Sequence, residues 1–218
     1  GSFELSPYQA IQAYQTIADD GFYTPLRSIR QIRETSGEIE FSYPYSVEQR
    51  MRPEPITLLK FALQQTFLTG TARGYSKKDI DKWNAGGKTG TSDDQRDSWF
   101  VGFAGDLLVL VWLGFDDNRP TVLTGRTGAF QVWKNFINDI NPVPTEKTKL
   151  QRIQYVWTDI DDGLLSGKSC RNSLLVPFIQ GTEPIKVPNV RKKCFTKNPS
   201  NNGAKIDKIK KIFEGGQG

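Results

Sequence analysis

The chain has 218 residues, 37% hydrophobic and 24% charged, a balance typical of a soluble globular protein with a real core. It has no histidine, which excludes a Ser-His-Asp triad and argues against a zinc site. Its longest apolar run, residues 107–115, is far shorter than the roughly 20 residues that span a bilayer. No secretory signal pattern occurs, so we expect any export signal or membrane anchor upstream.

The net charge of +5 is unevenly distributed. From Thr145 onward, 14 Lys and Arg stand against 7 Asp and Glu, whereas the earlier part carries 15 against 17. The basic tail has few aromatic residues among its charges, which favours a solvated surface over a nucleic-acid site. We therefore predict no nucleic-acid partner.

The first half of the chain predicts two helices separated by extended segments. Ser6-Pro7 with Gln9 forms a capping box, and Ile11, Tyr14, Ile17 and Ala18 follow at helical spacing. Residues 26–32 and 39–43 are predicted strands around the Ser36-Gly37 turn. A second helix is predicted over 54–68, with Ile56, Leu59, Ala62, Leu63 and Phe67 on one face. A polar loop is expected after it.

The next stretch is rich in strand signals. Residues 85–91 predict one strand, and residues 98–115 predict two more that turn at Ala104-Gly105-Asp106. The near-continuous apolarity of residues 107–115 indicates a strand covered on both faces. A helix over 128–140 is predicted to turn Phe130, Val132, Trp133, Phe136 and Ile137 inward. The predicted fold class is α+β, an antiparallel sheet flanked by helices.

Two prolines in residues 141–144 predict a boundary. We therefore divide the chain into residues 1–142, a small module at 143–197, and a linker with a short amphipathic helix at 198–218. Short strands are expected near 153–157 and 174–178. Cys170 and Cys194 lie in polar, turn-rich sequence, which favours a disulfide over two buried thiols and hence an oxidising compartment.

The candidate chemistry lies in Lys88-Thr89-Gly90-Thr91. Alone, such a motif also fits an ordinary strand edge. Its residue types nevertheless suit serine acyl transfer: Lys88 can attract a carboxylate and assist proton transfer, and Thr89 and Thr91 can hold that carboxylate. The backbone N–H of Thr91 can face a developing oxyanion. Gly90 lets a substrate peptide lie against the strand.

These residues resemble the third active-site motif of penicillin-binding proteins and serine β-lactamases, whose full set is Ser-x-x-Lys, Ser-x-Asn and Lys-Thr-Gly. The wider pattern is similar to the class A, bifunctional penicillin-binding proteins of the Gram-negative 1b type. It comprises Ser6-Pro7, Gly70-Thr71-Ala72-Arg73, Gly87 to Ser92, Asp97 to Gly102, and Gly125 to Ala129. The tail, with its Tyr155-Val156-Trp157 and cysteine pair, is similar to the C-terminal extension of that family.

The resemblance implies a penicillin-binding transpeptidase that cross-links peptidoglycan stem peptides ending in D-Ala-D-Ala and is acylated by β-lactams. It implies no cofactor for this half, a periplasmic location, and an inner-membrane anchor in the parent protein. A lipoprotein activator and divisome proteins are its expected partners. No Ser-x-x-Lys occurs in the chain, and Ser200 with Asn202 forms a Ser-x-Asn that follows the Lys-Thr-Gly strand within a linker. We therefore expect the sequence to start after the nucleophile, and the last strand to lack a partner strand.

Two alternatives remain open at this point. A serine β-lactamase-like hydrolase shares the Lys-Thr-Gly motif and the implied fold. A non-enzymatic module, in which the tail binds an activator or the anionic cell wall, would explain the basic residues after Pro144.

Overall fold

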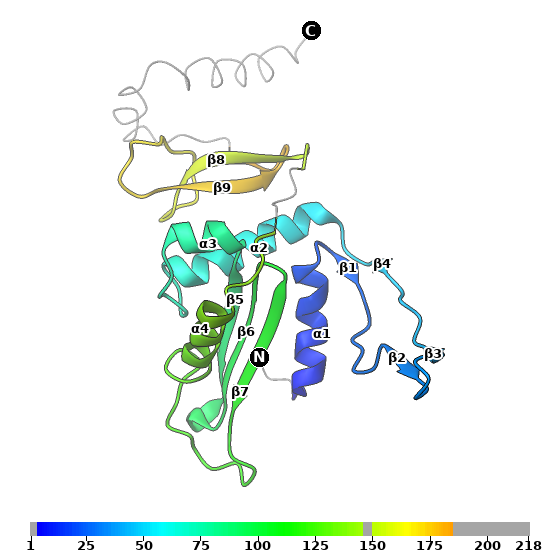
Figure 1. Cartoon of the computed structure of the whole chain (residues 1–218). Coiled ribbons are helices and arrows are strands. Elements are labelled where there is room, and N and C mark those ends of the chain that lie inside the picture. The colour runs from blue at the N-terminus through cyan, green and yellow to red at the C-terminus, as the bar shows by residue number, and fades with distance from the viewer. Residues whose placement is uncertain (1–3, 146–149, 185–218) are drawn as a thin grey trace. The chain divides into compact units, whose positions relative to one another are not determined.

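The computed structural model describes residues 4–145 and 150–184. They belong to two compact units divided after Leu150, and each is described by itself. Among the described residues, the first unit holds every α-helix and a three-stranded sheet (Figure 1). The division at residues 142 and 197 stays a prediction, because its third part lies outside the described residues.

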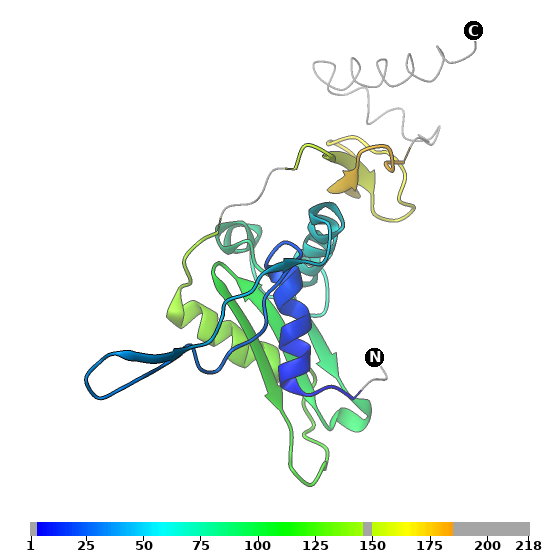
Figure 2. The same ribbon diagram turned by 90° about the vertical axis from the view of Figure 1, so that its right-hand side faces the viewer.

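The centre of the first unit is an antiparallel sheet with the strand order β5-β6-β7. These strands are β5 (Gly86–Thr91), β6 (Ser98–Ala104) and β7 (Leu107–Leu113). α4 (Ala129–Ile140) packs on one face of the sheet and α1 (Pro7–Ala18) on the other (Figure 1, Figure 2). The predicted α+β architecture is therefore confirmed.

The core between α4 and the sheet is aromatic. The Phe100 ring of β6 lies with its centroid 5.0 Å from those of Phe130 and Trp133 in α4. Phe67, from α2 (Pro53–Leu68), lies 5.6 Å from Trp133, and all four side chains are fully buried. The indole N–H of Trp133 donates to the Gly102 carbonyl at 3.2 Å, so this ring is buried without an unpaired polar group.

The buried face of α4 is narrower than the sequence predicted. Phe130, Trp133 and Ile137 face the core as expected, but Val132 and Phe136 are 48% and 44% exposed. They are four residues apart and lie on a neighbouring stripe that the sheet does not reach. Leu59 and Ala62 of α2 are likewise exposed rather than core residues.

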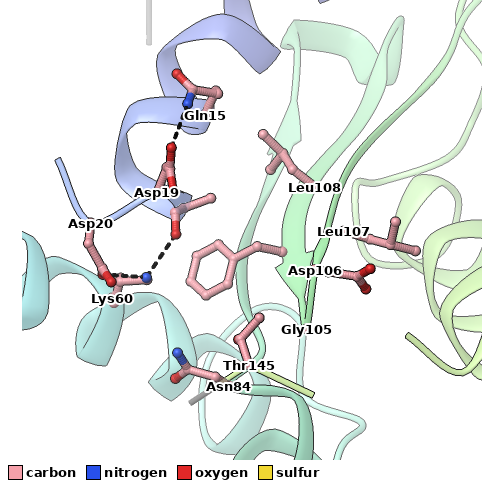
Figure 3. Close-up of a pocket in the computed structure, with 12 residues that line it drawn as sticks. Gln15, Asp19, Asp20, Lys60, Asn84, Gly105, Asp106, Leu107, Leu108 and Thr145 are labelled. Carbon is pink, nitrogen blue, oxygen red and sulfur yellow. Dashed lines mark hydrogen bonds and ion pairs between the residues drawn. The ribbon is translucent and has the colours of Figure 1, made fainter. Parts of the chain in front are cut away.

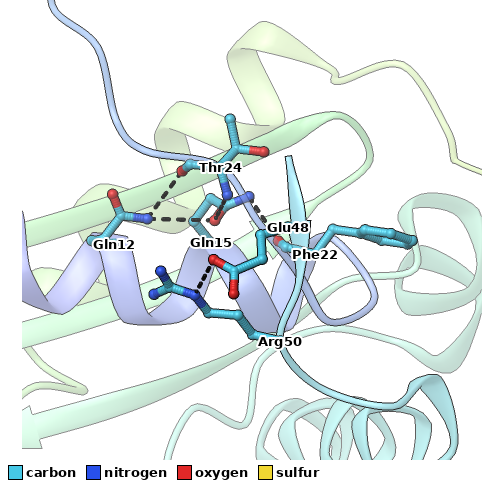
Figure 4. Close-up of polar contacts among 6 residues, drawn as sticks. All are labelled: Gln12, Gln15, Phe22, Thr24, Glu48 and Arg50. Carbon is cyan, nitrogen blue, oxygen red and sulfur yellow. Dashed lines mark hydrogen bonds and ion pairs between the residues drawn. The ribbon is translucent and has the colours of Figure 1, made fainter. Parts of the chain in front are cut away.

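α1 begins with the predicted capping box. The Ser6 hydroxyl accepts from the Gln9 N–H at 3.2 Å, and the Gln9 side chain accepts from the Ser6 N–H at 2.9 Å. Two glutamines of α1 then hold the chain that follows: Gln12 donates to the Thr24 carbonyl and Gln15 accepts from the Thr24 N–H (Figure 4). Side-chain amide hydrogen bonds therefore tie this segment to α1.

Two small strand pairs connect α1 to α2. β1 (Phe22–Tyr23) pairs with β4 (Glu48–Gln49), and β2 (Gln31–Arg33) pairs with β3 (Ile39–Ser42), both antiparallel. The β2–β3 hairpin extends away from the helices of its unit (Figure 2). Gly37, at φ +91°, makes its turn, as the Ser36-Gly37 signal predicted.

The expected polar loop after α2 contains a helix, so that prediction was wrong. α3 (Lys77–Trp83) begins with a second capping box, in which the Ser76 hydroxyl accepts from the Asp79 N–H at 3.2 Å. Its core contacts come from Ile80 and Trp83, both buried. Seven residues with two apolar positions give little periodicity, which explains the error.

β7 is shorter and more exposed than predicted. It ends at Leu113 rather than Phe115, and although α1 and α4 contact it from both sides, its side chains are half-buried and Trp112 is exposed. Within the described residues β7 pairs with β6 alone, and the predicted lack of a further partner strand stays a prediction.

The second unit is a hairpin of β8 (Ile153–Asp159) and β9 (Ser173–Ile179), which confirms both predicted strands. Cys194, the linker and the terminal helix lie outside the described residues, so these predictions, the disulfide included, stay predictions. Every helix among residues 4–145 and 150–184 is too short or too polar to span a bilayer.

Candidate functional site

The side chains of β5 alternate between the two faces of the sheet. Thr91 projects toward the loop before α4, because its hydroxyl accepts from the Gly125 N–H at 2.9 Å. Thr89 shares that face, whereas Lys88 and Gly90 belong to the opposite one, since successive side chains of a strand alternate. A Cβ on Gly90 would lie 3.1 Å from that of Trp99. The motif therefore places its two hydroxyls on one face and its cation on the other.

The outer edge of β5 exposes backbone groups of both threonines. The Gly87 carbonyl accepts from the Thr66 hydroxyl of α2 at 2.7 Å, so it points away from β6. Backbone groups in an antiparallel ladder alternate between inward and outward, which turns those of Thr89 and Thr91 outward as well. The Lys88 ammonium donates to the outward Thr89 carbonyl at 2.9 Å, in agreement with this. The Thr91 N–H consequently lies at an edge without a partner strand in the described residues.

Hydroxyl hydrogens remain available on the face of β5 that carries Thr89 and Thr91, called the threonine face from here on. The hydroxyls of Thr71 and Thr89 lie 2.6 Å apart and share one hydrogen bond, so one of their two hydrogens is left over. The Thr91 hydroxyl accepts from Gly125 and keeps its own hydrogen. This face can therefore donate two O–H groups to one carboxylate.

Two loops position these groups. The loop after α2 is held by the bonds from the Ala72 N–H to the Thr66 carbonyl and from the Gly74 N–H to the Phe67 carbonyl. The loop before α4 presses so closely on the sheet that a Cβ on Gly125 would lie 2.5 Å from the Gly90 carbonyl oxygen. The buried Ser98 anchors the same loop by donating to the Thr124 carbonyl at 2.8 Å.

Sequence reasoning placed Lys88, Thr89, Gly90 and Thr91 together on a strand, as the structure does. It did not identify Thr71 or Gly125 as parts of the site. Both lie in motifs that were used only to recognise the family resemblance, Gly70 to Arg73 and Gly125 to Ala129. No local spacing brings Thr71 to Thr89, because their contact depends on how α2 crosses the start of β5.

A cavity of about 340 Å³ lies at the other end of the sheet, beside the β6–β7 turn (Figure 3). The Lys60 ammonium there lies 2.6 Å from a carboxylate oxygen of Asp20 and donates to the Ala18 carbonyl. Its charge is thus compensated within the wall. Gly105 lines this cavity and Thr91 lies at the far end of its strand, so the cavity and the threonine face are separate. In the described residues, no group of three potential ligands is arranged to hold a metal ion.

The chain matches known proteins over most of its length. A family model described as "Penicillin binding protein transpeptidase domain" matches residues 1–117. Penicillin-binding protein 1B of Haemophilus influenzae is 40% identical over 141 residues, which cover 65% of this chain and 18% of that protein. Its counterpart from Escherichia coli is 28% identical over 171 residues, covering 78% and 20%.

The fold agrees with a solved relative. The crystal structure of penicillin-binding protein 1A from Haemophilus influenzae superposes with a TM-score of 0.67 at 22% identity, covering 84% of this chain and 33% of that one. The chain spans about a fifth of the length of the two 1B proteins. With more than half of its residues matched by the family model, the chain belongs to the penicillin-binding protein transpeptidase domain family.

Proposed function

We propose that this chain supplies the substrate-binding strand of a serine D,D-transpeptidase that cross-links peptidoglycan. The observation that carries the proposal is the outer edge of β5. There, the Thr71–Thr89 pair and Thr91 each have a spare hydroxyl hydrogen, beside a backbone edge that no strand of the described residues pairs with. A peptide that ends in a carboxylate can lie along such an edge as an added strand.

In this mechanism, a serine from a Ser-x-x-Lys motif outside the 218 residues attacks the carbonyl carbon of the penultimate D-alanine. The carbonyl oxygen becomes an oxyanion that the Thr91 N–H stabilises. The peptide bond then breaks, and the terminal D-alanine leaves as an amine that takes up the proton lost by the serine. An amine of a neighbouring stem peptide attacks the resulting ester, and the proton it loses passes to the serine oxygen as that oxygen leaves.

The other groups of the motif bind the donor peptide and add positive potential near the serine. Thr89 and Thr91 donate to the terminal carboxylate of the donor peptide, and Gly90 leaves room for its backbone. The exposed Lys88 adds positive potential and assists proton movement at the serine. A β-lactam, whose carboxylate lies near its reactive carbonyl, acylates the same serine. The chemistry requires no cofactor.

The parent protein is proposed to be a bifunctional glycosyltransferase and transpeptidase, anchored in the inner membrane with this part in the periplasm. A disulfide between Cys170 and Cys194 would be stable in that oxidising compartment and would staple the β8–β9 extension. A lipoprotein activator and divisome proteins are its proposed partners.

The reaction is tested by incubating the full-length protein with a stem peptide ending in D-Ala-D-Ala and an amine acceptor. We expect cross-linked peptide and free D-alanine in equal amounts, and a loss of both in the Lys88→Ala variant. Release of D-alanine without cross-linking, or rapid turnover of penicillin, would favour a hydrolase. If neither product forms, and binding to peptidoglycan sacculi disappears when residues after Pro144 are deleted, the binding-module alternative replaces the proposal.

A further inference from the structure

Arg126 is next in sequence to a residue that contacts the threonine face. It follows Gly125, whose N–H donates to the Thr91 hydroxyl at 2.9 Å. Its side chain is exposed, and within residues 4–145 and 150–184 its guanidinium has no ion-pair or hydrogen-bond partner. A positively charged side chain is therefore attached to the residue that follows Gly125, whose N–H bonds to a hydroxyl of the proposed carboxylate site.

The backbone that carries Arg126 is held on both sides. The Thr124 N–H donates to the Thr127 hydroxyl at 2.9 Å, and the Thr127 N–H donates back to the Thr124 hydroxyl at 3.2 Å. The Arg126 carbonyl accepts from the Gln131 side chain at 2.9 Å. Arg126 thus projects from a fixed turn. Binding a ligand there costs less conformational entropy than binding by an arginine on a loose loop.

β5 itself places no positive charge on the threonine face, so a cation there has to come from another segment. Lys88 lies on the opposite face from Thr89 and Thr91, and its ammonium is engaged with the Thr89 carbonyl at the strand edge. The threonine face therefore has hydroxyl donors but no cation of its own on β5. A carboxylate bound there is best compensated by a guanidinium, which can donate two parallel N–H groups to both oxygens.

We propose that Arg126 is a specificity-determining residue that binds the terminal carboxylate of the acyl donor together with Thr89 and Thr91. The inference rests on the proposed transpeptidase function and deepens it, because it assigns the preference for donors that end in a carboxylate to a residue outside the Lys-Thr-Gly-Thr motif. Arg73, two residues after Thr71 and also exposed, is the competing cation.

The test compares two thioester donors with the full-length protein. One is a benzoyl-D-alanyl thioester whose leaving group ends in a carboxylate, and the other ends in the matched carboxamide. Thiol release reports acylation in both. We expect Arg126→Gln to slow the carboxylate donor about tenfold or more and the carboxamide donor less than about twofold, because only the first forms a charge-assisted bond. Arg126→Lys should lie between.

Arg119→Gln serves as the matched control, since Arg119 is an exposed arginine between β7 and α4 whose guanidinium already pairs with Asp117 at 3.6 Å. It should leave both rates unchanged. Equal slowing of both donors by Arg126→Gln, or a carboxylate-specific loss in Arg73→Gln instead, overturns the assignment to Arg126. If the unmodified protein releases thiol from neither donor, the transpeptidase proposal itself fails, an outcome distinct from the other two.

Discussion

Thr91 offers two different groups to the proposed site. Its hydroxyl accepts from the Gly125 N–H and keeps a hydrogen to donate, while its backbone N–H faces the outer edge of β5. The first function needs a hydroxyl, whereas the second needs only a backbone. A change of side chain can therefore separate carboxylate binding from oxyanion stabilisation.

We expect Thr91→Val to reduce the rate of acylation by a fluorescent penicillin roughly tenfold, because a hydrogen bond to a charged group is lost. Thr91→Ser, which retains the hydroxyl, should keep most of the rate. Both variants are compared with the unmodified full-length protein after circular dichroism has shown that they fold. A Thr91→Val protein that is acylated at the unmodified rate would remove Thr91 from the carboxylate site.

At the scale of elements, the contact between β5 and the loop before α4 depends on the absence of a side chain at Gly125. An added Cβ would lie 2.5 Å from the Gly90 carbonyl and 2.7 Å from that of Trp99, and neither backbone atom can move without distorting the sheet. The loop would have to lift, which would break the bond to Thr91.

Gly125→Ala is therefore expected to lower the rate of penicillin acylation as strongly as Thr91→Val and also to lower the denaturation midpoint. Gly74→Ala is the control, because its new Cβ would meet only side-chain atoms at 3.4 Å and beyond, an ordinary contact distance. Unchanged acylation in Gly125→Ala would show that the loop does not hold the threonine face.

α3 provides a pH-dependent prediction. The hydrogen bond from the Ser76 hydroxyl to Asp79, at 2.6 Å, lowers the pKa of the Asp79 carboxyl below its usual range. Because the folded-state pKa is the lower one, the stabilisation is present above the unfolded pKa and is lost as pH falls through the folded value.

The Ser76→Ala variant should cost about 1 kcal/mol of unfolding free energy at neutral pH, as for other N-cap removals. The cost should shrink in strongly acidic solution, where Asp79 is protonated in both proteins. Urea unfolding at several pH values measures it. A cost that stays constant into acid would mean that the Asp79 carboxylate does not contribute through this capping box.

The two capping boxes show how far sequence reasoning reaches. Ser6 with Gln9 was predicted because a long apolar periodicity follows it, and the structure confirms it. Ser76 with Asp79 has the same spacing but introduces a seven-residue helix in a polar stretch, where only Ile80 and Trp83 face the core. A short helix fixed by tertiary contacts leaves too weak a periodic signal.

Some residues of the candidate site could likewise be predicted from local sequence, and others could not. Lys88 to Thr91 are consecutive, so their strand and their chemistry could be predicted locally. The contact between Thr71 and Thr89 spans 18 positions and depends on the packing of α2 against β5, which no periodicity encodes. The separation of Lys88 from the threonines follows from strand alternation. The proposed role of Arg126 follows only from the loop before α4, which brings Gly125 to Thr91.

At the scale of the whole molecule, the central claim is that the threonine face of β5 forms one wall of an acyl-transfer site. The sequence contains no Ser-x-x-Lys, so the proposed nucleophile comes from outside these residues. The claim therefore concerns this chain together with the segment that carries that serine.

The most direct test is the intact mass after incubation with a penicillin, measured on this chain and on the protein extended to include the serine. We predict one penicillin adduct on the extended protein and none on the chain alone, and a strongly reduced adduct when Thr89 and Thr91 are both replaced by valine in the extended protein. A folded extended protein that gains no adduct, or one acylated equally well without the two hydroxyls, would contradict the account.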